Sequence, residues 1–220
     1  VVLKKVLSFL LVFSLFLYNF YPSIGGIEIV TENLANEFVK MGHQVTVITN
    51  TPDDKSRTFP FTVLRNPSIR ETFKAYKKCD VYVHQAISLK YVWPLFILRK
   101  PFFIVYHQVG WEPGIKGRIK KVFSHFTHNI CVSETTAKGY GLKKYNIIYN
   151  AYNDIIFMQT NFGERKDIAF VGRLNRDKGA YLLIKAFNDF KESSHSDYEL
   201  NLIGDSEERK DIEEFAKGTK

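Results

Sequence analysis

The pattern that most constrains this chain lies in its first 49 residues, where four segment types follow one another. An apolar run is broken at residues 22–26, which end in Gly25 and Gly26. Apolar residues then recur at helical spacing up to Gly42, which is expected just beyond the end of a helix. An alternating apolar segment follows at residues 44–49. Strand, glycine loop, helix and strand make a βαβ unit, which predicts a parallel sheet.

Strand-like and helical apolar patterns continue to alternate over the next hundred residues. This alternation predicts a doubly wound α/β domain. A further helix is expected to begin after Ser133, whose side chain is a good N-cap. Strands are predicted at residues 61–64, 81–84, 102–106, 130–132 and 146–150, and helices at residues 69–78, 89–99 and 117–126.

A domain boundary is predicted where the apolar periodicity stops. Residues 159–166 are polar and contain Gly163, and the strand and helix patterns restart after them. We therefore predict an N-terminal domain over residues 1–158, a linker over 159–166 and a second, incomplete domain over 167–220. The second domain is expected to contain strands at 167–171 and 199–203 and helices at 178–192 and 206–217. Two strands and two helices bury too little for a complete doubly wound sheet.

The first segment allows three interpretations. Lys4 and Lys5 precede an uncharged run over residues 6–21, which suits a signal peptide, a short membrane anchor or a buried strand with its loop. The run is shorter than the roughly 20 residues of a spanning helix. Its β-branched and aromatic residues favour the buried strand, and the anchor stays open as an alternative.

Charge and cysteine content narrow the class of partner and the compartment. The net charge is +8 and the isoelectric point about 9.3. Such a balance favours nucleic acid, anionic lipid or phosphorylated small molecules, with a merely solvated basic surface as the alternative. Cys79 and Cys131 stand beside apolar runs and are expected to be free, buried thiols in a reducing cytoplasm. The basic residues cluster at Lys116, Arg118, Lys120, Lys121 and at Lys138, Lys143, Lys144.

Missing motifs exclude several classes of chemistry. The sequence contains no Asp-x-Asp, no His-x-x-x-His and no cysteine pair, so we expect no metal held by the protein. It also contains no Gly-x-Ser-x-Gly elbow and no Walker loop. These absences argue against a hydrolase of that class and against a nucleoside triphosphatase.

Gly25 and Gly26 stand between the first predicted strand and its helix. Without side chains, they let a ligand approach the free N–H groups of the helix N-terminus. This geometry suits a phosphate or a sugar hydroxyl. The Gly-x-Gly-x-x-Gly dinucleotide fingerprint is missing, and many glycine pairs merely make a turn.

A basic pair, Arg173 and Lys178, follows the first strand of the second predicted domain. Arginine grips phosphate oxygens in a planar, bidentate way, and Lys178 would add a mobile charge at the start of the next helix. Together they can stabilise a departing diphosphate. From spacing alone, ordinary surface charge with Arg173 paired to Asp177 is an equal alternative.

His107 follows an apolar strand and precedes Gly110, so it is expected at the sheet edge where open α/β sheets bind ligands. There it can hydrogen-bond a substrate or pass a proton. His84 holds a comparable position at another strand end. Taken alone, each is more often structural.

Several segments occur in one order along the chain: YPSIGGIE (21–28), GHQVTV (42–47), YHQ (106–108), VSE (132–134), IYN (148–150), VGRL (171–174) and KG (178–179). Together they resemble the group 1 glycosyltransferases, also called glycosyltransferase family 4, which have the GT-B fold. The resemblance spans nearly the whole chain.

The resemblance implies two Rossmann-like domains, with an acceptor bound mainly by the first and a nucleotide-sugar donor mainly by the second. Sugar transfer would retain the anomeric configuration without a metal or other cofactor. Arg173 and Lys178 would hold the donor diphosphate, and His107 would contact the transferred sugar or assist transfer. Gly25 and Gly26 would let their loop approach the same phosphates, and Asn150 would bind substrate.

One element of the family pattern is missing. The Glu-x7-Glu element, which contacts the donor sugar and ribose, is expected beyond Lys220. Four glutamates near that residue lack its spacing among themselves and fall in a predicted charged helix: Glu207, Glu208, Glu213 and Glu214. We therefore expect a truncated copy or a fragment.

The leading hypothesis is a glycosyltransferase that acts on a cell-surface glycan or glycolipid. It would be cytoplasmic, with its basic surface resting on an anionic membrane. The alternative is a noncatalytic remnant or acceptor-binding module. Nucleic-acid binding rests on charge alone and is not expected.

Overall fold

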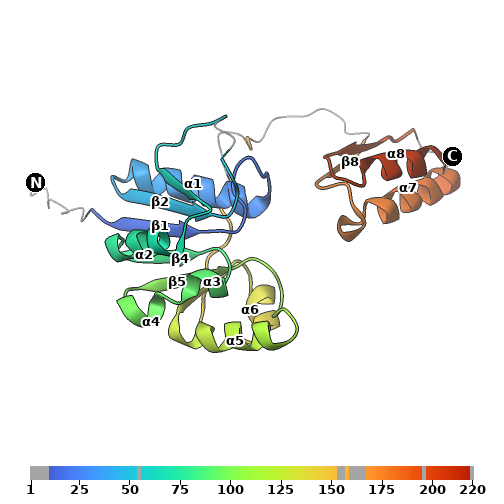
Figure 1. The fold of residues 1–220 in the computed structure, drawn as a ribbon. Coiled ribbons are helices and arrows are strands. Elements are labelled where there is room, and N and C mark those ends of the chain that lie inside the picture. The colour runs from blue at the N-terminus through green and yellow to red at the C-terminus, as the bar shows by residue number, and fades with distance from the viewer. Residues whose placement is uncertain (1–9, 54–55, 153–156, 159–166, 195–196, 219–220) are drawn as a thin grey trace, which may run out of the picture. The chain divides into compact units, whose positions relative to one another are not determined.

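The computed structural model describes residues 10–53, 56–152, 157–158, 167–194 and 197–218. The chain divides into two compact units, Val1–Phe157 and Met158–Lys220 (Figure 1). The sequence-based boundary at residue 158 stands next to this division. The predicted linker, residues 159–166, lies outside the described residues.

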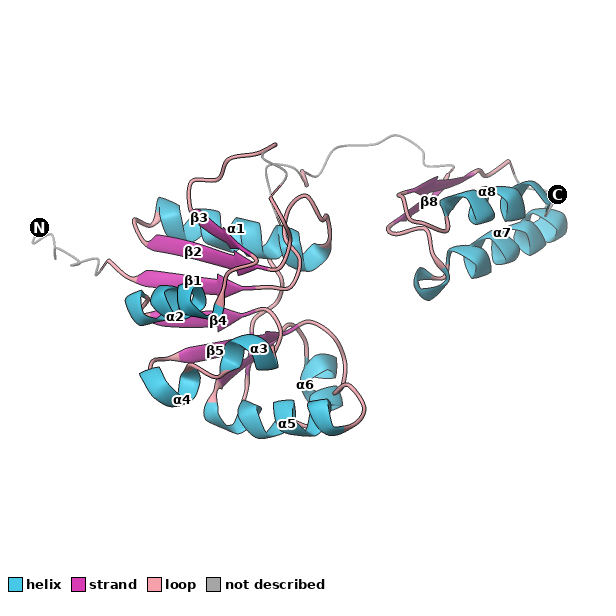
Figure 2. Cartoon of the chain, in the orientation of Figure 1, coloured by secondary structure: helices cyan, strands magenta, loops and turns pink. Residues whose placement is uncertain are grey.

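The described residues of the first unit form a seven-stranded sheet in which every pair of neighbouring strands is parallel (Figure 2). The strand order is β3-β2-β1-β4-β5-β6-β7. The predicted doubly wound α/β fold is therefore confirmed. The strands are β1 Val12–Phe16, β2 Gln44–Thr49, β3 Thr62–Arg65, β4 Val81–His84, β5 Phe102–Tyr106, β6 His128–Cys131 and β7 Asn146–Ile147.

Alternate residues of the strands build a core on each face of the sheet. Side chains of a strand point to opposite faces in turn. In β1, Phe13 and Leu15 pack with α1 (Gly26–Lys40) on one face. Phe16 packs on the other face with Tyr76 of α2 (Ile69–Lys78). Because both faces are covered, the strands read as nearly continuous apolar runs.

The described part of the first apolar segment is a buried strand, as the sequence favoured. Strand β1 lies between β2 and β4, and Phe13 to Phe16 are buried. Residues 1–9 lie outside the described part of the chain. They include the first four residues of the run 6–21, for which a membrane anchor was the alternative. Within the described residues, no helix is both long enough and apolar enough to cross a membrane.

The helices of the first unit differ from the prediction mainly at Pro94. One helix was predicted over residues 89–99, but two short helices stand there. Proline has no N–H to donate, and its ring clashes with the carbonyl four residues earlier, here that of Lys90. The remaining helical elements are α3 Leu89–Val92, α4 Leu95–Leu98, α5 Ile115–Phe123, the 3₁₀ turn η1 Ser124–Phe126, and α6 Glu134–Tyr140.

Two local predictions in the first unit are confirmed. The Ser133 hydroxyl accepts a hydrogen bond from the Thr136 N–H at 3.1 Å, so Ser133 is the N-cap of α6. Cys79 and Cys131 are free and fully buried in the core. Burial raises the pKa of the Cys79 thiol to about 11, which leaves it protonated and unreactive at neutral pH.

The second unit contains a two-stranded parallel sheet and two helices among its described residues. They are β8 Ile168–Val171, the 3₁₀ turn η2 Arg176–Lys178, α7 Ala180–Ser194, β9 Leu200–Ile203 and α8 Arg209–Gly218. Its core is small and consists of Leu174, Ala180, Ile184 and Ile212, with Phe170 packed against it.

The predicted start of the helix at residue 178 was wrong. Lys178 ends the 3₁₀ turn η2, and α7 begins only at Ala180. Gly179 separates the two because its φ of 80° lies in the left-handed region, which glycine adopts without strain. The Asn175 side chain closes the turn by accepting a hydrogen bond from the Lys178 N–H at 3.1 Å.

His84 at the end of β4 is completely buried in the aromatic core. Its ring lies 4.8 Å from the Phe16 ring and 4.5 Å from the Phe102 ring, centroid to centroid. Its Nε2 and the Tyr76 hydroxyl share a hydrogen bond of 2.8 Å, and its Nδ1 has no hydrogen-bond partner among the residues that the structure describes. Burial lowers the pKa of His84 to about 3. His84 is therefore a neutral core residue.

This burial predicts a loss of stability in acid. Below about pH 6.5 the unfolded chain binds a proton at this histidine. The folded chain does not bind that proton until the pH falls near 3. The free energy of unfolding should therefore decrease as the pH is lowered through this window. His84 should contribute up to about 1.4 kcal/mol per pH unit. His84→Gln should remove the part of this pH dependence that comes from His84. Urea denaturation followed by tryptophan fluorescence at several pH values measures it. An unchanged slope, or an equal change in the exposed control His125→Gln, would contradict this prediction.

Candidate functional site

A cavity of about 350 Å³ opens where the strand order of the first sheet reverses. From β1 the chain runs outward through β2 and β3, then returns to place β4 on the other side of β1. The loops after β1 and β4 therefore part from each other, and open α/β sheets bind ligands in such a crevice. The lining comes from residues that follow β1, β4 and β5 and from the start of α1, including Tyr18, Asn19, Glu28, Gln85, His107 and Trp111.

His107 is positioned in this cavity by its place directly after β5. Its Nε2 lies 2.7 Å from the Oε1 atom of Gln85, which directly follows the neighbouring strand β4. Gln85 is only 2% exposed, whereas His107 is half-buried. Burial lowers the pKa of His107, so its ring is neutral at pH 7. A neutral imidazole at a cavity wall can accept a hydrogen bond or a proton.

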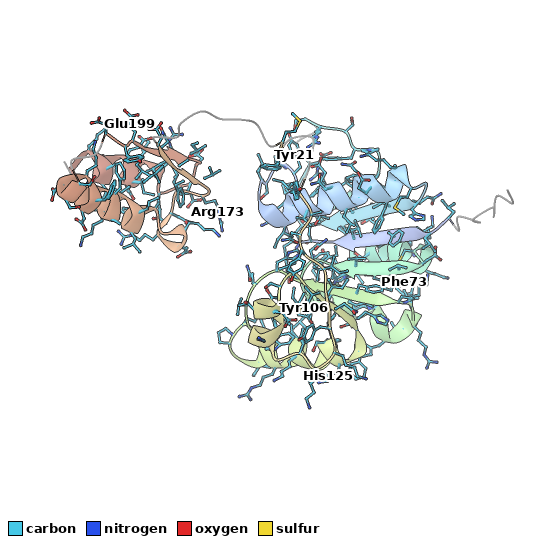
Figure 3. The ribbon with its side chains drawn as sticks, turned by 180° about the vertical axis from the view of Figure 1, so that it is seen from behind. Tyr21, Phe73, Tyr106, His125, Arg173 and Glu199 are labelled. Atoms are coloured by element: carbon cyan, nitrogen blue, oxygen red, sulfur yellow. The ribbon has the colours of Figure 1, made fainter. Side chains whose placement is uncertain are left out.

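Aromatic and charged side chains form another wall of the cavity. The Trp111 Nε1–H donates to the Tyr140 carbonyl at 2.8 Å, and the two rings meet edge to face at 4.8 Å. Tyr106, which ends β5 and is labelled in Figure 3, packs against both rings. Lys120 of α5 forms a salt bridge of 2.9 Å with Glu112. Aromatic faces beside carboxylate and amide groups suit a ligand that has both hydroxyls and apolar faces, as sugars do.

The glycine loop was expected to admit a phosphate or a sugar hydroxyl, and its surroundings add a negative charge that the prediction did not consider. Gly25 is the N-cap of α1, and a side chain added at Gly26 would meet nothing within 4 Å. A side chain added at Gly25 would stand 2.5 Å from a carboxylate oxygen of Glu28. The Glu28 carboxylate therefore lies close to the N-cap residue of α1. Binding of a phosphate or a sugar hydroxyl by this loop stays a prediction.

Arg173 and Lys178 lie in the loop that follows β8 in the second unit; Figure 3 labels Arg173 there. Both are exposed, and neither side chain forms an ion pair with the described residues. The alternative pairing of Arg173 with Asp177 is therefore not seen. Arg176 in the same loop lies over the Tyr181 ring, 4.7 Å from its centroid. Arg173 and Lys178 remain available to a ligand, and their binding of a diphosphate stays a prediction.

The structure brings together some of the predicted site residues. His107 and the start of α1 line one cavity, and Gly25 and Gly26 directly precede that part of α1. Asn150 is exposed beyond β7, the strand at one edge of the sheet, and is not among the residues that line this cavity. Arg173 and Lys178 belong to the other unit.

Sequence reasoning missed several residues of the cavity. Gln85 follows a predicted strand, just as His107 does, and neighbouring parallel strands end at one edge, so strand order would have pointed to it. Trp111 and Glu112 follow Gly110 in a segment without periodicity. No sequence signal indicated that this segment folds back over the cavity.

Two family models match the chain over residues 24–220. Residues 24–154 match the model of Glycosyltransferase Family 4, and residues 153–220 match the model of Glycosyl transferases group 1. No curated protein sequence matches the chain significantly.

Solved structures share the fold at low sequence identity. A glycosyltransferase from Rickettsia africae aligns with a TM-score of 0.72 at 15% identity, over 96% of this chain and 64% of that one. An α-glucosyltransferase in complex with UDP and a 13-mer DNA aligns with a TM-score of 0.63 at 12% identity, over 96% and 60%. WaaG, a glycosyltransferase involved in lipopolysaccharide biosynthesis, aligns with a TM-score of 0.59 at 17% identity, over 94% and 67%.

The chain thus spans less than two thirds of the first two of these structures. The family models together cover residues 24–220, and the sheet order is that of a Rossmann-like domain. The chain belongs to the group 1 glycosyltransferases of glycosyltransferase family 4, with the GT-B fold.

Proposed function

We propose that the protein transfers a sugar from a nucleotide-sugar donor to a cell-surface glycan or glycolipid, with retention of the anomeric configuration. In this reaction the bond from the anomeric carbon to the diphosphate oxygen breaks, the acceptor oxygen bonds to that carbon, and the acceptor proton leaves. The observation that carries the proposal is the cavity at the reversal of strand order, with neutral His107 on its wall.

The two units would divide the work. The cavity of the first unit, with His107, Trp111 and Glu28, offers hydrogen-bonding groups and aromatic faces to sugar hydroxyls and rings. The loop with Arg173 and Lys178 offers a diphosphate two cations that form no ion pair with the described residues. The negative charge of the diphosphate grows as the sugar leaves. Asn150 is proposed as a further substrate contact.

Turnover is tested with a panel of nucleotide sugars and a version of the protein extended through the Glu-x7-Glu element. Sugar transfer or donor hydrolysis is expected, and anomeric configuration is read by NMR of the product. We also propose that no metal is required, so activity should survive EDTA. No turnover of any donor by the extended version would contradict the proposal.

A noncatalytic remnant or acceptor-binding module is the alternative. The coding DNA downstream separates the two: an in-frame Glu-x7-Glu favours the enzyme, and an early stop favours the remnant. Nucleic-acid binding is not part of the proposal, although one structural neighbour was solved with DNA. Tight, salt-sensitive binding of DNA by this chain would revive it.

The first prediction from this proposal concerns the donor clamp. Arg173→Ala should weaken binding of a nucleoside diphosphate about 10- to 100-fold, because a hydrogen bond to a charged group is lost. Lys178→Ala should weaken the same binding. Calorimetry with UDP, GDP and ADP measures the effect.

Lys185→Ala is the matched control, because Lys185 is an exposed cation on α7 outside the loop. Its binding should equal that of the unmodified protein. If Arg173→Ala binds nucleoside diphosphates as tightly as the unmodified protein, Arg173 does not hold the diphosphate. The same conclusion follows if Lys185→Ala weakens this binding as much as Arg173→Ala does.

We also propose that the protein contacts an anionic membrane surface. An exposed face of α5 and η1 that carries apolar and basic residues supports this contact. Four exposed apolar residues recur at helical spacing along it, with exposed fractions of 40% to 75%. The exposed Phe96 of α4 extends this apolar strip, with its ring 5.1 Å from that of Phe123. Basic side chains flank the strip, and a basic amphipathic helix suits an anionic lipid surface. The four apolar residues are Ile115, Ile119, Val122 and Phe126, and the exposed cations are Lys116, Arg118 and Lys121.

The second prediction concerns this surface. Replacing Lys116, Arg118 and Lys121 together by Gln should weaken binding to phosphatidylglycerol-containing vesicles about 100-fold, since each cation contributes about 1 kcal/mol near such a surface. The pair Ile119→Ser and Val122→Ser should remove the part of the binding that survives high salt. Vesicle co-sedimentation measures both.

The second basic cluster provides a charge-matched control. Lys138, Lys143 and Lys144 are also exposed, and their joint replacement by Gln should leave vesicle binding nearly unchanged. Ile69→Ser, at an exposed site on α2, is the apolar control. Equal losses in variants and controls would mean that only net charge matters.

A further inference from the structure

Gln85 and His107 are brought together by the pairing of two parallel strands. Strand β4 ends at His84 and strand β5 at Tyr106, and the two strands are hydrogen-bonded neighbours. The residues that follow them therefore leave the sheet at the same edge. There the Gln85 Oε1 and the His107 Nε2 lie 2.7 Å apart.

Gln85 is held more firmly than the histidine it contacts. Its side chain is almost completely buried, and its backbone N–H donates to the Phe16 carbonyl at 2.9 Å. His84 and Ile87, which stand on either side of it in the chain, are both buried in the core. The amide is thus a fixed partner for the imidazole ring.

The chemistry of an amide oxygen decides which ring nitrogen holds the proton. An amide oxygen only accepts hydrogen bonds, so Nε2 of His107 must donate and must bear the hydrogen. In the neutral ring Nδ1 then has a free lone pair. Nδ1 forms no hydrogen bond with any described residue and is not fully buried, and His107 lines the cavity.

We propose that Gln85 is a positioning residue that holds His107 in its Nε2–H tautomer, so that Nδ1 accepts a hydrogen bond from a ligand hydroxyl in the cavity. The ligand's identity as a sugar rests on the proposed function, whereas the tautomer does not. A hydroxyl-bearing donor sugar or acceptor fits the lone pair, but a carbonyl or phosphate oxygen does not, because neither donates a hydrogen bond.

A neutral partner also keeps the ring uncharged. A carboxylate in place of Gln85 would stabilise the imidazolium form, whereas an amide does not. Around the cavity stand Glu28 of α1, Tyr18 after β1 and Tyr140 of α6, together with Glu112 and Lys120, which neutralise each other in a salt bridge. His107 therefore acts as an acceptor in this site, and Gln85 selects that role.

The test is ¹⁵N NMR of the histidine rings in the ligand-free chain, where protonated and unprotonated ring nitrogens give well-separated signals. The unmodified protein should show His107 with protonated Nε2 and unprotonated Nδ1. Gln85→Met removes the acceptor and should shift the tautomer ratio about 2- to 12-fold, the change that corresponds to one neutral hydrogen bond. Gln85→Glu keeps the shape and should raise the pKa of His107 by about one to three pH units.

Gln108→Met and Gln108→Glu are matched controls, because Gln108 lines the same cavity, is exposed and stands next to His107. They should leave the His107 tautomer unchanged. A protonated Nδ1 in the unmodified protein, or equal effects at positions 85 and 108, would overturn the proposal. If Gln85→Met does not fold, the unmodified protein and the isosteric Gln85→Glu still decide it. Because no donor is present, failure here is distinct from failure of the proposed glycosyl transfer.

Discussion

The structure of the first unit depends on the pairing of β1 with a parallel strand on each side. The register with β2 begins with Val12 opposite Gln44, and the register with β4 begins with Phe13 opposite Val81. A buried strand must satisfy its backbone groups in this way, because no water is available to them. With β1 in the middle, the chain has to reverse direction across the sheet, and this reversal opens the cavity.

Two histidines show how much the position within this frame matters. His84 and His107 both stand at the ends of neighbouring strands, yet His84 is enclosed by Phe16 and Phe102 whereas His107 reaches the cavity. Burial lowers the pKa of both. Of the two, only His107 lines the cavity, so the same residue type packs in the core in one case and lines the candidate site in the other.

Much of the fold could be predicted, because period-2 and helical apolar patterns record which face of each element is buried. The errors occurred where one residue overrides the pattern. Pro94 divides a periodic stretch into two helices, and Gly179 delays α7 until after Lys178. The site was predicted less completely: His107 could be placed from its strand, whereas Gln85 and Trp111 required knowledge of which loops meet.

The sequence by itself determined the parallel α/β architecture, the glycine loop before α1 and the family, because these depend on local periodicity and on short motifs in a fixed order. Only the tertiary structure decided that Gln85 contacts His107 and that Glu28 of α1 and Trp111 line one cavity with them. Both results depend on strand order and chain direction. These bring together residues that are far apart in the chain, and no local pattern encodes them.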